Sequence, residues 1–440
     1  MTSPASQPER SGSSRRHFLA TSTAVAAGAA LATGLTLDRT AHAGVDDTLK
    51  IGLIGCGGRG SGAAKNALMA DANCKLTAIG DVFPDRLTQG LNNLKGDGDI
   101  AGKVAVTDEH CYTGFDAYKG VLQSGVDVVI LATPPHFRPL HLRAAVEAGK
   151  HIFCEKPVAV DAPGVRSVLE TTELARQKRL NLVSGLCWRY DHGVRETMKR
   201  VKDGAIGDVV SMQSNYLTGT LWSFDRQPGW SDMEYQMRNW MYYTWLSGDH
   251  IAEQFVHTLD KALWTMGDEP PVSCVGLGGR QQRTERPKWG QIYDHHAVIY
   301  EYPNDVRVFA FARQMDGTAN DNEHYIFGTK GRASVLRHTI KGETNWRYKG
   351  AKPNMYDVEH QELFAAIRKG DTINNGVYMA RSTMMAIMGR EATYTGKEIN
   401  WESALASTID LSPPKYDWIA LPTPPVPIPG IAQTQLASRA

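Results

Sequence analysis

The sequence predicts an α/β protein of two domains: a parallel sheet covered by helices, then a helix-poor domain built on an open, mainly antiparallel sheet. Two patterns lead to this prediction. Up to about residue 205, short apolar strands alternate with helical segments, which is the order of a doubly wound parallel sheet. From there to about residue 345, long strands follow one another and one helix is indicated. A chain of 440 residues is long enough to give each domain its own core.

The first 43 residues have the pattern of an export leader. Ser14–Leu19 (SRRHFL) is a twin-arginine motif, residues 20–37 form a weakly apolar run, and Ala41–Ala43 (AHA) is a cleavage pattern. A membrane anchor would need about 20 strongly apolar residues, whereas this run is rich in alanine, glycine and threonine. We therefore expect cleavage near Gly44 and a protein exported by the twin-arginine route, to the periplasm or elsewhere, without a membrane anchor.

The next strand carries the most specific motif. Apolar residues 49–54 run into Gly55–Gly60 (GCGGRG), which has the spacing G-x-G-x-x-G and precedes a helix and a second strand. In a dinucleotide-binding turn, the first glycine permits the sharp turn, the second lets the backbone approach a pyrophosphate, and the third lets helix and strand pack closely. The turn residues predicted to bind the cofactor are Gly55, Cys56, Gly57, Gly58, Arg59 and Gly60.

Asp81 ends the second strand, 21 residues after Gly60. A carboxylate at this position can accept a hydrogen bond from the ribose 2′-hydroxyl and would repel a 2′-phosphate. We therefore expect NAD as the cofactor and NADP as the less favoured one. Arg86 lies close enough in the sequence to moderate that preference.

The remaining elements complete the two domains. The Rossmann domain, residues 45–190, is expected to add strands at 126–133, 151–155 and 181–187, with helices at 137–149 and 162–178, and a further helix follows it at 192–203. The second domain, residues 191–410, is expected to hold strands at 209–217, 297–303, 306–314 and 333–340, with helices at 249–266, 356–369 and 377–395. A proline-rich arm, residues 411–440, should lie extended against a neighbour over 421–430.

Composition excludes several kinds of partner. The formal charge is +1, and near −1 without the leader, which gives no reason to expect nucleic acid or an anionic membrane. The six cysteines have no metal-ligand spacing. Four of them fall within or beside predicted parallel strands, so we expect buried core thiols rather than disulfides.

Residues 132–157 (ATPPHFRPLHLRAAVEAGKHIFCEKP) resemble the glucose–fructose oxidoreductase/inositol dehydrogenase family, Gfo/Idh/MocA. The resemblance extends over the glycine turn, the segment 203–209 (DGAIGDV), Gly328–Gly331 (GTKG) and Tyr394–Lys397 (YTGK). It implies a Rossmann domain followed by an α/β domain whose open sheet faces the nicotinamide and often forms an oligomer interface. We therefore expect a homo-oligomer.

The resemblance and the sheet pattern together indicate a catalytic lysine. Lys156, in Glu155-Lys156-Pro157, ends a predicted parallel strand at the carboxyl edge where doubly wound sheets bind ligands. Its ammonium group can stabilise the alkoxide that forms as hydride leaves a hydroxyl-bearing carbon. The alternative is a surface ion pair with Glu155. Thr133, Pro134 and Glu155 are predicted to contact the cofactor beside it.

Family members commonly carry Asp-x-x-x-His on a helix of the second domain, and here the element reads Glu253–His257 (EQFVH). His257 is the candidate for proton transfer and Glu253 the candidate that orients it, as both would share one helix face. Glutamate in place of aspartate is a departure that puts the orienting role in doubt, and an ordinary helix histidine is the alternative. Asp249 and His250 are reserve candidates. No metal is expected, because the order is not H-E-x-x-H.

Two further groups are candidates for substrate contacts. Arg189 and Tyr190 follow the strand at 181–187, again at the carboxyl edge. The stretch 222–245 holds eight aromatic residues, among them Trp240, which could stack on sugar faces or pack in a subunit interface.

These observations predict an exported NAD(P)-dependent oxidoreductase that moves hydride between nicotinamide and a sugar or polyol hydroxyl. Because free NAD is not expected to be plentiful outside the cytosol, the cofactor should be loaded before export and retained. The alternative resembles glycoside hydrolase family 109, in which a retained NAD serves transient oxidation, elimination and re-reduction. A third possibility, a sugar sensor without catalysis, is disfavoured by the presence of both Lys156 and His257.

Overall fold

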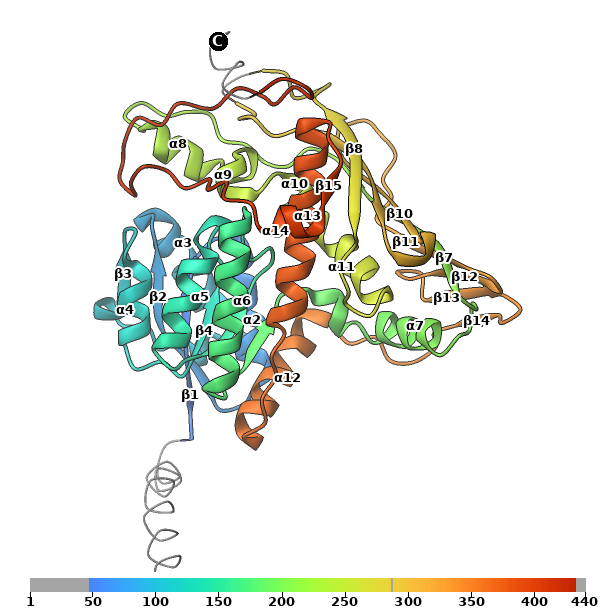
Figure 1. Cartoon of the computed structure of the whole chain (residues 1–440). Coiled ribbons are helices and arrows are strands. Elements are labelled where there is room, and N and C mark those ends of the chain that lie inside the picture. Colours follow the sequence, from blue (N-terminus) through green and yellow to red (C-terminus); the bar gives the residue numbers. More distant parts are fainter. Residues whose placement is uncertain (1–46, 286–287, 433–440) are drawn as a thin grey trace, which may run out of the picture. The chain divides into compact units, whose positions relative to one another are not determined.

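The structure is a computed structural model that describes residues 47–285 and 288–432. The predicted leader therefore lies outside the described residues. From Leu49 onward, the chain forms two sheets with helices between and around them (Figure 1). No helix within the described ranges combines the length and apolar character that crossing a bilayer requires.

The first sheet confirms the predicted Rossmann domain. Its six strands are all parallel and lie in the order β3-β2-β1-β4-β5-β6. The strands are β1 (Leu49–Ile54), β2 (Cys74–Asp81), β3 (Cys111–Thr113), β4 (Val128–Leu131), β5 (His151–Cys154) and β6 (Leu182–Ser184). The helices are α2 (Gly58–Ala70), α3 (Pro84–Gly96), α4 (Ala117–Gln123), α5 (Arg138–Glu147) and α6 (Ala162–Gln177). The next helix, α7 (His192–Lys202), contacts α11 (Val256–Thr265) of the second domain. The strand order reverses between β1 and β4, which is where such sheets bind ligands.

The second sheet is open, mixed and mostly antiparallel, in the order β14-β13-β12-β11-β7-β10-β9-β8-β15. Among the described strands of this second sheet, only β7 and β10 pair in parallel. The strands are β7 (Val209–Thr218), β8 (Ser273–Gly279), β9 (His295–Glu301), β10 (Arg307–Gln314), β11 (His324–Gly328), β12 (Gly331–Ser334), β13 (Thr339–Gly342), β14 (Trp346–Arg347) and β15 (Ile399–Asn400).

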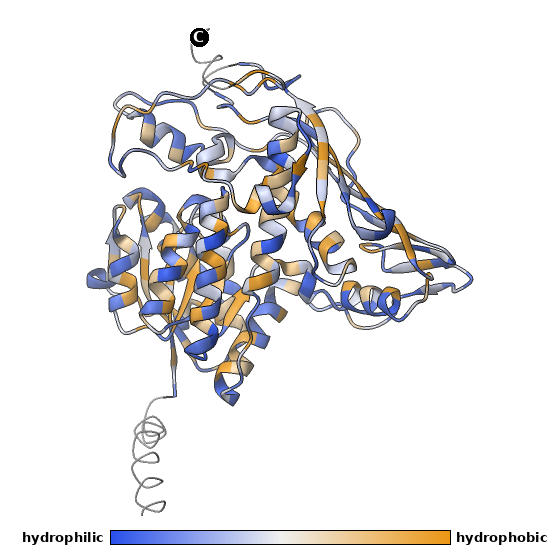
Figure 2. Cartoon of the chain, in the orientation of Figure 1, coloured by the Kyte–Doolittle hydropathy of each residue, from blue (hydrophilic) through white to orange (hydrophobic). Residues whose placement is uncertain are grey.

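Helices join the two sheets into one core. The helices are α8 (Asp232–Arg238), α9 (Thr244–Ser247), α10 (His250–Glu253), α11 (Val256–Thr265), α12 (Met355–Lys369), α13 (Gly376–Thr395) and α14 (Trp401–Leu405). The nearly fully buried α13 contacts α6 of the first domain and α11, β8 and β9 of the second (Figure 1). Figure 2 shows apolar residues along the strands of the first sheet. All six cysteines are free and five are buried, as predicted for core thiols.

Two predicted elements are wrong in detail. The single helix expected at 249–266 is broken into α10 and α11, because α10 ends at Glu253 and α11 begins only at Val256. The strand expected at 333–340 is a hairpin of β12 and β13, which turns at 335–338, where His338 has a positive φ of 50°. In both places an apolar pattern continues through a bend that local sequence did not reveal.

The described part of the proline-rich arm lies against its own chain. The Met233 backbone N–H donates to the Ile419 carbonyl at 3.1 Å and the Gln236 side-chain amide donates to the Leu421 carbonyl at 2.5 Å. Further on, the Tyr293 hydroxyl donates to the Pro427 carbonyl at 3.0 Å. The neighbour of the extended segment is therefore α8 and the second sheet of the same protein.

Candidate active site

The glycine turn has the geometry that a dinucleotide requires. Gly55 has a φ of +99°, and a Cβ there would lie 2.6 Å from the Ala132 carbonyl carbon. A Cβ on Gly60 would lie 1.8 Å from the Gly55 carbonyl oxygen, so only glycine allows this contact between turn and helix. A Cβ on Gly57 would meet no atom within 4 Å, which leaves the backbone open to a ligand. These three positions match the three roles predicted from the motif.

A cavity of about 380 Å³ opens beside this turn. Its walls include most of the predicted cofactor residues, namely Gly55, Gly57, Gly58, Arg59, Gly60, Asp81, Thr133 and Pro134. Cys56 contributes differently, because its backbone N–H donates to the Asp81 carboxylate at 2.7 Å and so holds that side chain in place. The cavity lies at the carboxyl edge of β1, β2 and β4, so an NAD pyrophosphate would meet the α2 N-terminus.

Asp81 is fixed for recognition of a ribose. One carboxylate oxygen accepts from Cys56 and the other accepts from the Phe83 backbone N–H at 2.9 Å. Burial raises the pKa of Asp81, while these two backbone donors favour its charged form. Each oxygen keeps a lone pair that can accept from a ribose hydroxyl. Arg86 lies in the same wall, with its guanidinium 5.1 Å from the centre of the Phe224 ring.

Replacing Asp81 with alanine is expected to weaken NAD binding roughly 10- to 150-fold, because charge-assisted hydrogen bonds to the ribose are lost. NADP binding should change less, so the preference for NAD narrows. Titration calorimetry of cofactor-free protein with both dinucleotides measures this. Asp203→Ala, in an exposed ion pair with Lys199, is the matched control and should bind NAD normally. Equal losses for NAD and NADP would contradict the assignment.

Aromatic residues of the second domain cover this cavity. Trp222, Phe224 and Trp240 line it together with Asp81 and Arg86. Trp240 therefore lines the cavity beside the glycine turn, and its contact with a substrate stays a prediction.

Arg238 links this aromatic segment of the second domain to the first domain. It pairs with Asp85 on α3 at 3.0 Å and lies over the Phe83 ring, 4.1 Å from its centre. It also pairs with Glu234 on its own helix at 3.0 Å.

The C-terminal arm closes over the same region. Trp418 stacks on Phe83 with ring centres 5.5 Å apart and lies 5.1 Å from Phe115. The Tyr416 hydroxyl and the His136 Nε2 atom are 2.8 Å apart, within hydrogen-bond distance. Phe83 and Phe115 are themselves cavity residues. The cavity is thus covered by two segments of the chain that are distant from it in the sequence.

Lys156 lies directly after β5 and forms an ion pair with Glu253 of α10. The Lys156 Nζ and Glu253 Oε1 atoms are 2.9 Å apart, with 13% and 12% of the side chains exposed. The same ammonium group also donates to the Glu253 backbone carbonyl. Glu155 pairs instead with Arg59 of the glycine turn at 2.8 Å. The surface Lys156–Glu155 pair considered as an alternative is therefore not the arrangement found.

His257 lies on α11, beyond the break after α10, and Glu253 turns to Lys156 rather than to it. The predicted orientation of His257 by Glu253 is therefore wrong, because the two residues do not share one continuous helix. Burial lowers the pKa of His257 well below its usual value, and the cations Lys156, Lys261 and Arg59 lower it further. The Nδ1 atom has no hydrogen-bond partner among the described residues. A neutral imidazole beside a lysine ammonium can accept a proton at neutral pH.

Arg189 and Tyr190 are engaged inside the protein. The Arg189 guanidinium donates to Asp260 and Asp268 from all three nitrogens. The Tyr190 hydroxyl donates to Asn375 at 2.7 Å. A direct substrate contact from either residue stays a prediction, which these bonds do not favour.

Lys261 was not predicted from the sequence. It is buried, its ammonium donates to the His257 carbonyl at 2.7 Å and lies 5.2 Å from the centre of the Trp188 ring, and burial lowers its pKa to about 8. The spacing of four residues after His257 was the available signal, since it places Lys261 one helical turn further on.

Comparison with known proteins identifies the family of both domains. Residues 49–185 match the model of an oxidoreductase family with an NAD-binding Rossmann fold, GFO_IDH_MocA, and residues 194–334 match the GFO/IDH/MocA C-terminal domain. An inositol 2-dehydrogenase 4 of Saccharopolyspora erythraea is 28% identical over 331 residues, which is 73% of this chain and 86% of that protein. A 2,7-anhydro-N-acetylneuraminate hydratase of Escherichia coli is 26% identical over 249 residues, which is 56% of this chain and 60% of that protein.

Solved structures have the same fold. The scyllo-inositol dehydrogenase of Lactobacillus casei, with bound NAD(H) and scyllo-inositol, has a TM-score of 0.63 at 19% identity, covering 81% of this chain and 100% of that one. The two domains of this chain therefore match models of one family, and the first match includes the glycine turn. The chain belongs to the Gfo/Idh/MocA oxidoreductases, and its first domain is an NAD-binding Rossmann domain.

Proposed function

We propose that this protein is an exported NAD-dependent oxidoreductase acting on a sugar or polyol hydroxyl and keeping its cofactor bound through turnover. The observation that carries the chemical part is the Lys156–Glu253 ion pair directly after β5, the strand beside the one that borders the NAD cavity, together with His257, whose pKa the Lys156 charge helps to lower. Inositol dehydrogenases among the relatives support a polyhydroxylated substrate. The twin-arginine motif supports export.

The roles of the side chains follow from their charges. Bound NAD supplies the hydride acceptor. The Lys156 ammonium donates a hydrogen bond to the reacting hydroxyl oxygen and stabilises the negative charge that develops there. Neutral His257 accepts the hydroxyl proton. Glu253 holds Lys156 in position by their ion pair and keeps the pair near neutral overall before substrate arrives.

Cofactor retention is supported by the cover over the adenosine end of the cavity. Release of a dinucleotide through this side requires separation of Trp418 from Phe83 and Phe115, and of Arg238 from Asp85. Because these contacts join segments that are far apart in the sequence, they favour a slow opening step. A retained cofactor suits an exported enzyme that cannot draw on the cytosolic NAD pool.

Trp418→Ala is expected to speed NAD release roughly 5- to 150-fold, since two aromatic contacts of about 0.5–1.5 kcal/mol each are lost. Dissociation of co-purified NAD, followed after dilution into an NAD scavenger, measures the rate. Trp346→Ala removes a tryptophan of β14 outside the cavity and is the matched control. A wild-type protein that loses its NAD within one dilution step would refute retention.

We also propose that the outer face of the second sheet joins copies of this chain. Phe309 and Val275 flank Ile299, and Phe311 and Leu277 flank Ala297, forming two apolar rows across β10, β9 and β8. Leu277 is 67% exposed and the other three large side chains are also exposed. Apolar rows on an open sheet face are typical of subunit interfaces.

Leu277→Glu is therefore expected to lower the molecular mass in solution to that of a smaller assembly. Light scattering after size exclusion gives the mass directly. Leu140→Glu, at an exposed leucine on α5, should leave it unchanged. A wild-type monomer at micromolar concentration would contradict the proposal.

A second function, redox-neutral cleavage or hydration of a sugar derivative, is favoured by one comparison. The hydratase among the relatives is named for a reaction without net redox change. Purified protein is to be mixed with sugars, polyols and glycosides while reduced-nicotinamide absorbance and released reducing sugar are followed. Persistent absorbance supports the oxidoreductase, and cleavage without it supports the alternative. If no compound gives either signal, both functions fail.

A further inference from the structure

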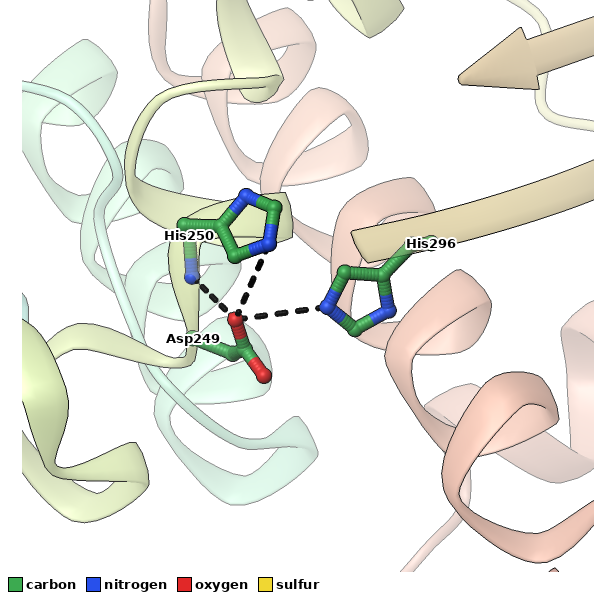
Figure 3. Close-up of side chains that lie close together, drawn as sticks. All are labelled: Asp249, His250 and His296. Atoms are coloured by element: carbon green, nitrogen blue, oxygen red, sulfur yellow. Dashed lines mark hydrogen bonds and ion pairs between the residues drawn. The ribbon is translucent and has the colours of Figure 1, made fainter. Parts of the chain in front are cut away.

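A cluster of three metal-ligating side chains lies in the second domain, apart from the NAD cavity. Asp249 and His250 lie at the N-terminus of α10 and His296 lies on β9 (Figure 3). All three side chains are buried. The Asp249 Oδ1 atom is 3.3 Å from His296 Nε2 and 3.9 Å from His250 Nε2, and the three ligand atoms lie within 4.8 Å of one another.

The hydrogen bond at His296 Nδ1 determines the protonation state of His296 Nε2, the nitrogen that faces Asp249. The Thr393 hydroxyl donates to the Arg390 carbonyl at 2.9 Å, so its oxygen accepts from His296 Nδ1, also at 2.9 Å. Nδ1 therefore carries a proton. In the neutral ring, the Nε2 lone pair then points at the Asp249 carboxylate, and this contact needs a cation or a second proton between the two atoms.

Neither histidine Nε2 has another partner. Both atoms are buried without a hydrogen bond among the residues that the structure describes, and both rings point toward the same Asp249 oxygen (Figure 3). The Asp249 Oδ1 atom accepts from the His250 backbone N–H, and the two buried imidazole nitrogens that converge on this oxygen have no hydrogen-bond partner among the described residues.

The carboxylate itself is rigidly held. Asp249 has φ 74° and ψ 162°, a backbone conformation that is normally confined to glycine. Its Oδ2 atom accepts from the Tyr394 hydroxyl at 2.5 Å and from the Tyr293 backbone N–H at 3.0 Å. These bonds aim Oδ1 at the histidines. A strained backbone conformation persists only where many surrounding contacts hold it, and such conformations are common at ligand sites.

We propose that Asp249, His250 and His296 bind one divalent transition-metal ion of the zinc type. Zinc prefers imidazole nitrogen and carboxylate oxygen at about 2.0–2.2 Å, which gives ligand atoms roughly 3.3 Å apart in a tetrahedral site. The Asp249–His296 distance of 3.3 Å meets this spacing, whereas the Asp249–His250 distance of 3.9 Å has to shorten when the ion binds. The ion ties β9 to α10, whose last residue, Glu253, pairs with Lys156. The site departs from the sequence-based expectation of no metal.

The test is metal analysis of the purified holoenzyme, followed by removal with a chelator and titration with Zn²⁺ or Co²⁺. One equivalent of metal per chain, a visible tetrahedral Co²⁺ spectrum and a higher Tm with Zn²⁺ are expected. His296→Gln and His250→Gln should lose the spectrum. Thr393→Val removes the acceptor for His296 Nδ1, together with the Thr393–Arg390 hydrogen bond, and should weaken metal affinity about 10- to 100-fold.

His324→Gln is the matched control, since His324 is a buried histidine of the same sheet whose Nε2 also lacks a partner among the described residues. It should bind metal like the wild type. Absence of metal from wild-type protein, with no Co²⁺ spectrum and no change in Tm, would overturn the proposal. In that case nitrogen NMR would find His296 protonated at both ring nitrogens, as an ion pair with Asp249.

Discussion

Replacing Lys156 with methionine is expected to lower kcat by about 10²- to 10³-fold while NAD stays bound. Methionine keeps the length and apolar stem of the side chain but removes the ammonium group, so the alkoxide loses its nearest stabilising charge. The Glu253 carboxylate also loses its partner at 2.9 Å and adds a negative charge beside the reacting oxygen. Steady-state rates together with the absorbance of bound cofactor measure both quantities.

The control for this variant is Lys199→Met, which breaks an exposed ion pair with Asp203 on α7. An exposed pair contributes little to stability, so kcat should stay within about twofold of the wild-type value. An unchanged kcat in Lys156→Met would remove this residue from the reaction. Loss of bound NAD together with loss of folded-state circular dichroism would assign it a structural role instead.

Replacing His257 with asparagine is expected to lower kcat by about 10²- to 10⁴-fold, the usual contribution of a positioned general base. Asparagine keeps hydrogen-bonding capacity in a similar volume but cannot accept a proton. Cofactor binding should be retained, because His257 is not among the residues that line the NAD cavity. A full rate in this variant would assign the proton transfer to another group.

The pH profile gives a second measurement on the same residue. Because burial and nearby cations lower the pKa of His257, the folded enzyme keeps this imidazole neutral below the usual histidine range. The rate should stay level from pH 7 downward and fall only when the pH passes below the lowered pKa. Lys156→Met removes one of the cations, so the acidic limb of its residual activity should move to higher pH. If the acidic limb lies at the same pH in Lys156→Met and in the wild type, the Lys156 charge does not influence the group that titrates.

The Rossmann domain could be predicted because its determinants are local. Gly60 packs against the Gly55 carbonyl five residues away, and Gly55 packs against Ala132, which follows the neighbouring strand β4. Asp81 is positioned by the end of its own strand and by the turn after β1. The continuous apolar runs predicted the buried parallel strands of this domain.

The site beyond the Rossmann domain could be predicted only in part. Lys156 was found because it ends a strand, but its partner Glu253 is 97 residues away. The same motif suggested a Glu253–His257 pair, which the helix break at Gln254 prevents. Trp418 covers Phe83 from the other end of the chain, and no local pattern indicates such a contact. Long-range packing decided all three outcomes.

Single-turnover reduction of the co-purified cofactor tests the central claim most directly. Protein carrying its own NAD, without added cofactor, is mixed with each sugar or polyol, and reduced-nicotinamide absorbance is recorded with time. The account predicts one equivalent of reduced cofactor per site with at least one substrate, and about 10²- to 10³-fold slower reduction in Lys156→Met. Reduction at the wild-type rate in that variant, or no reduction and no release of reducing sugar with any compound, would contradict it.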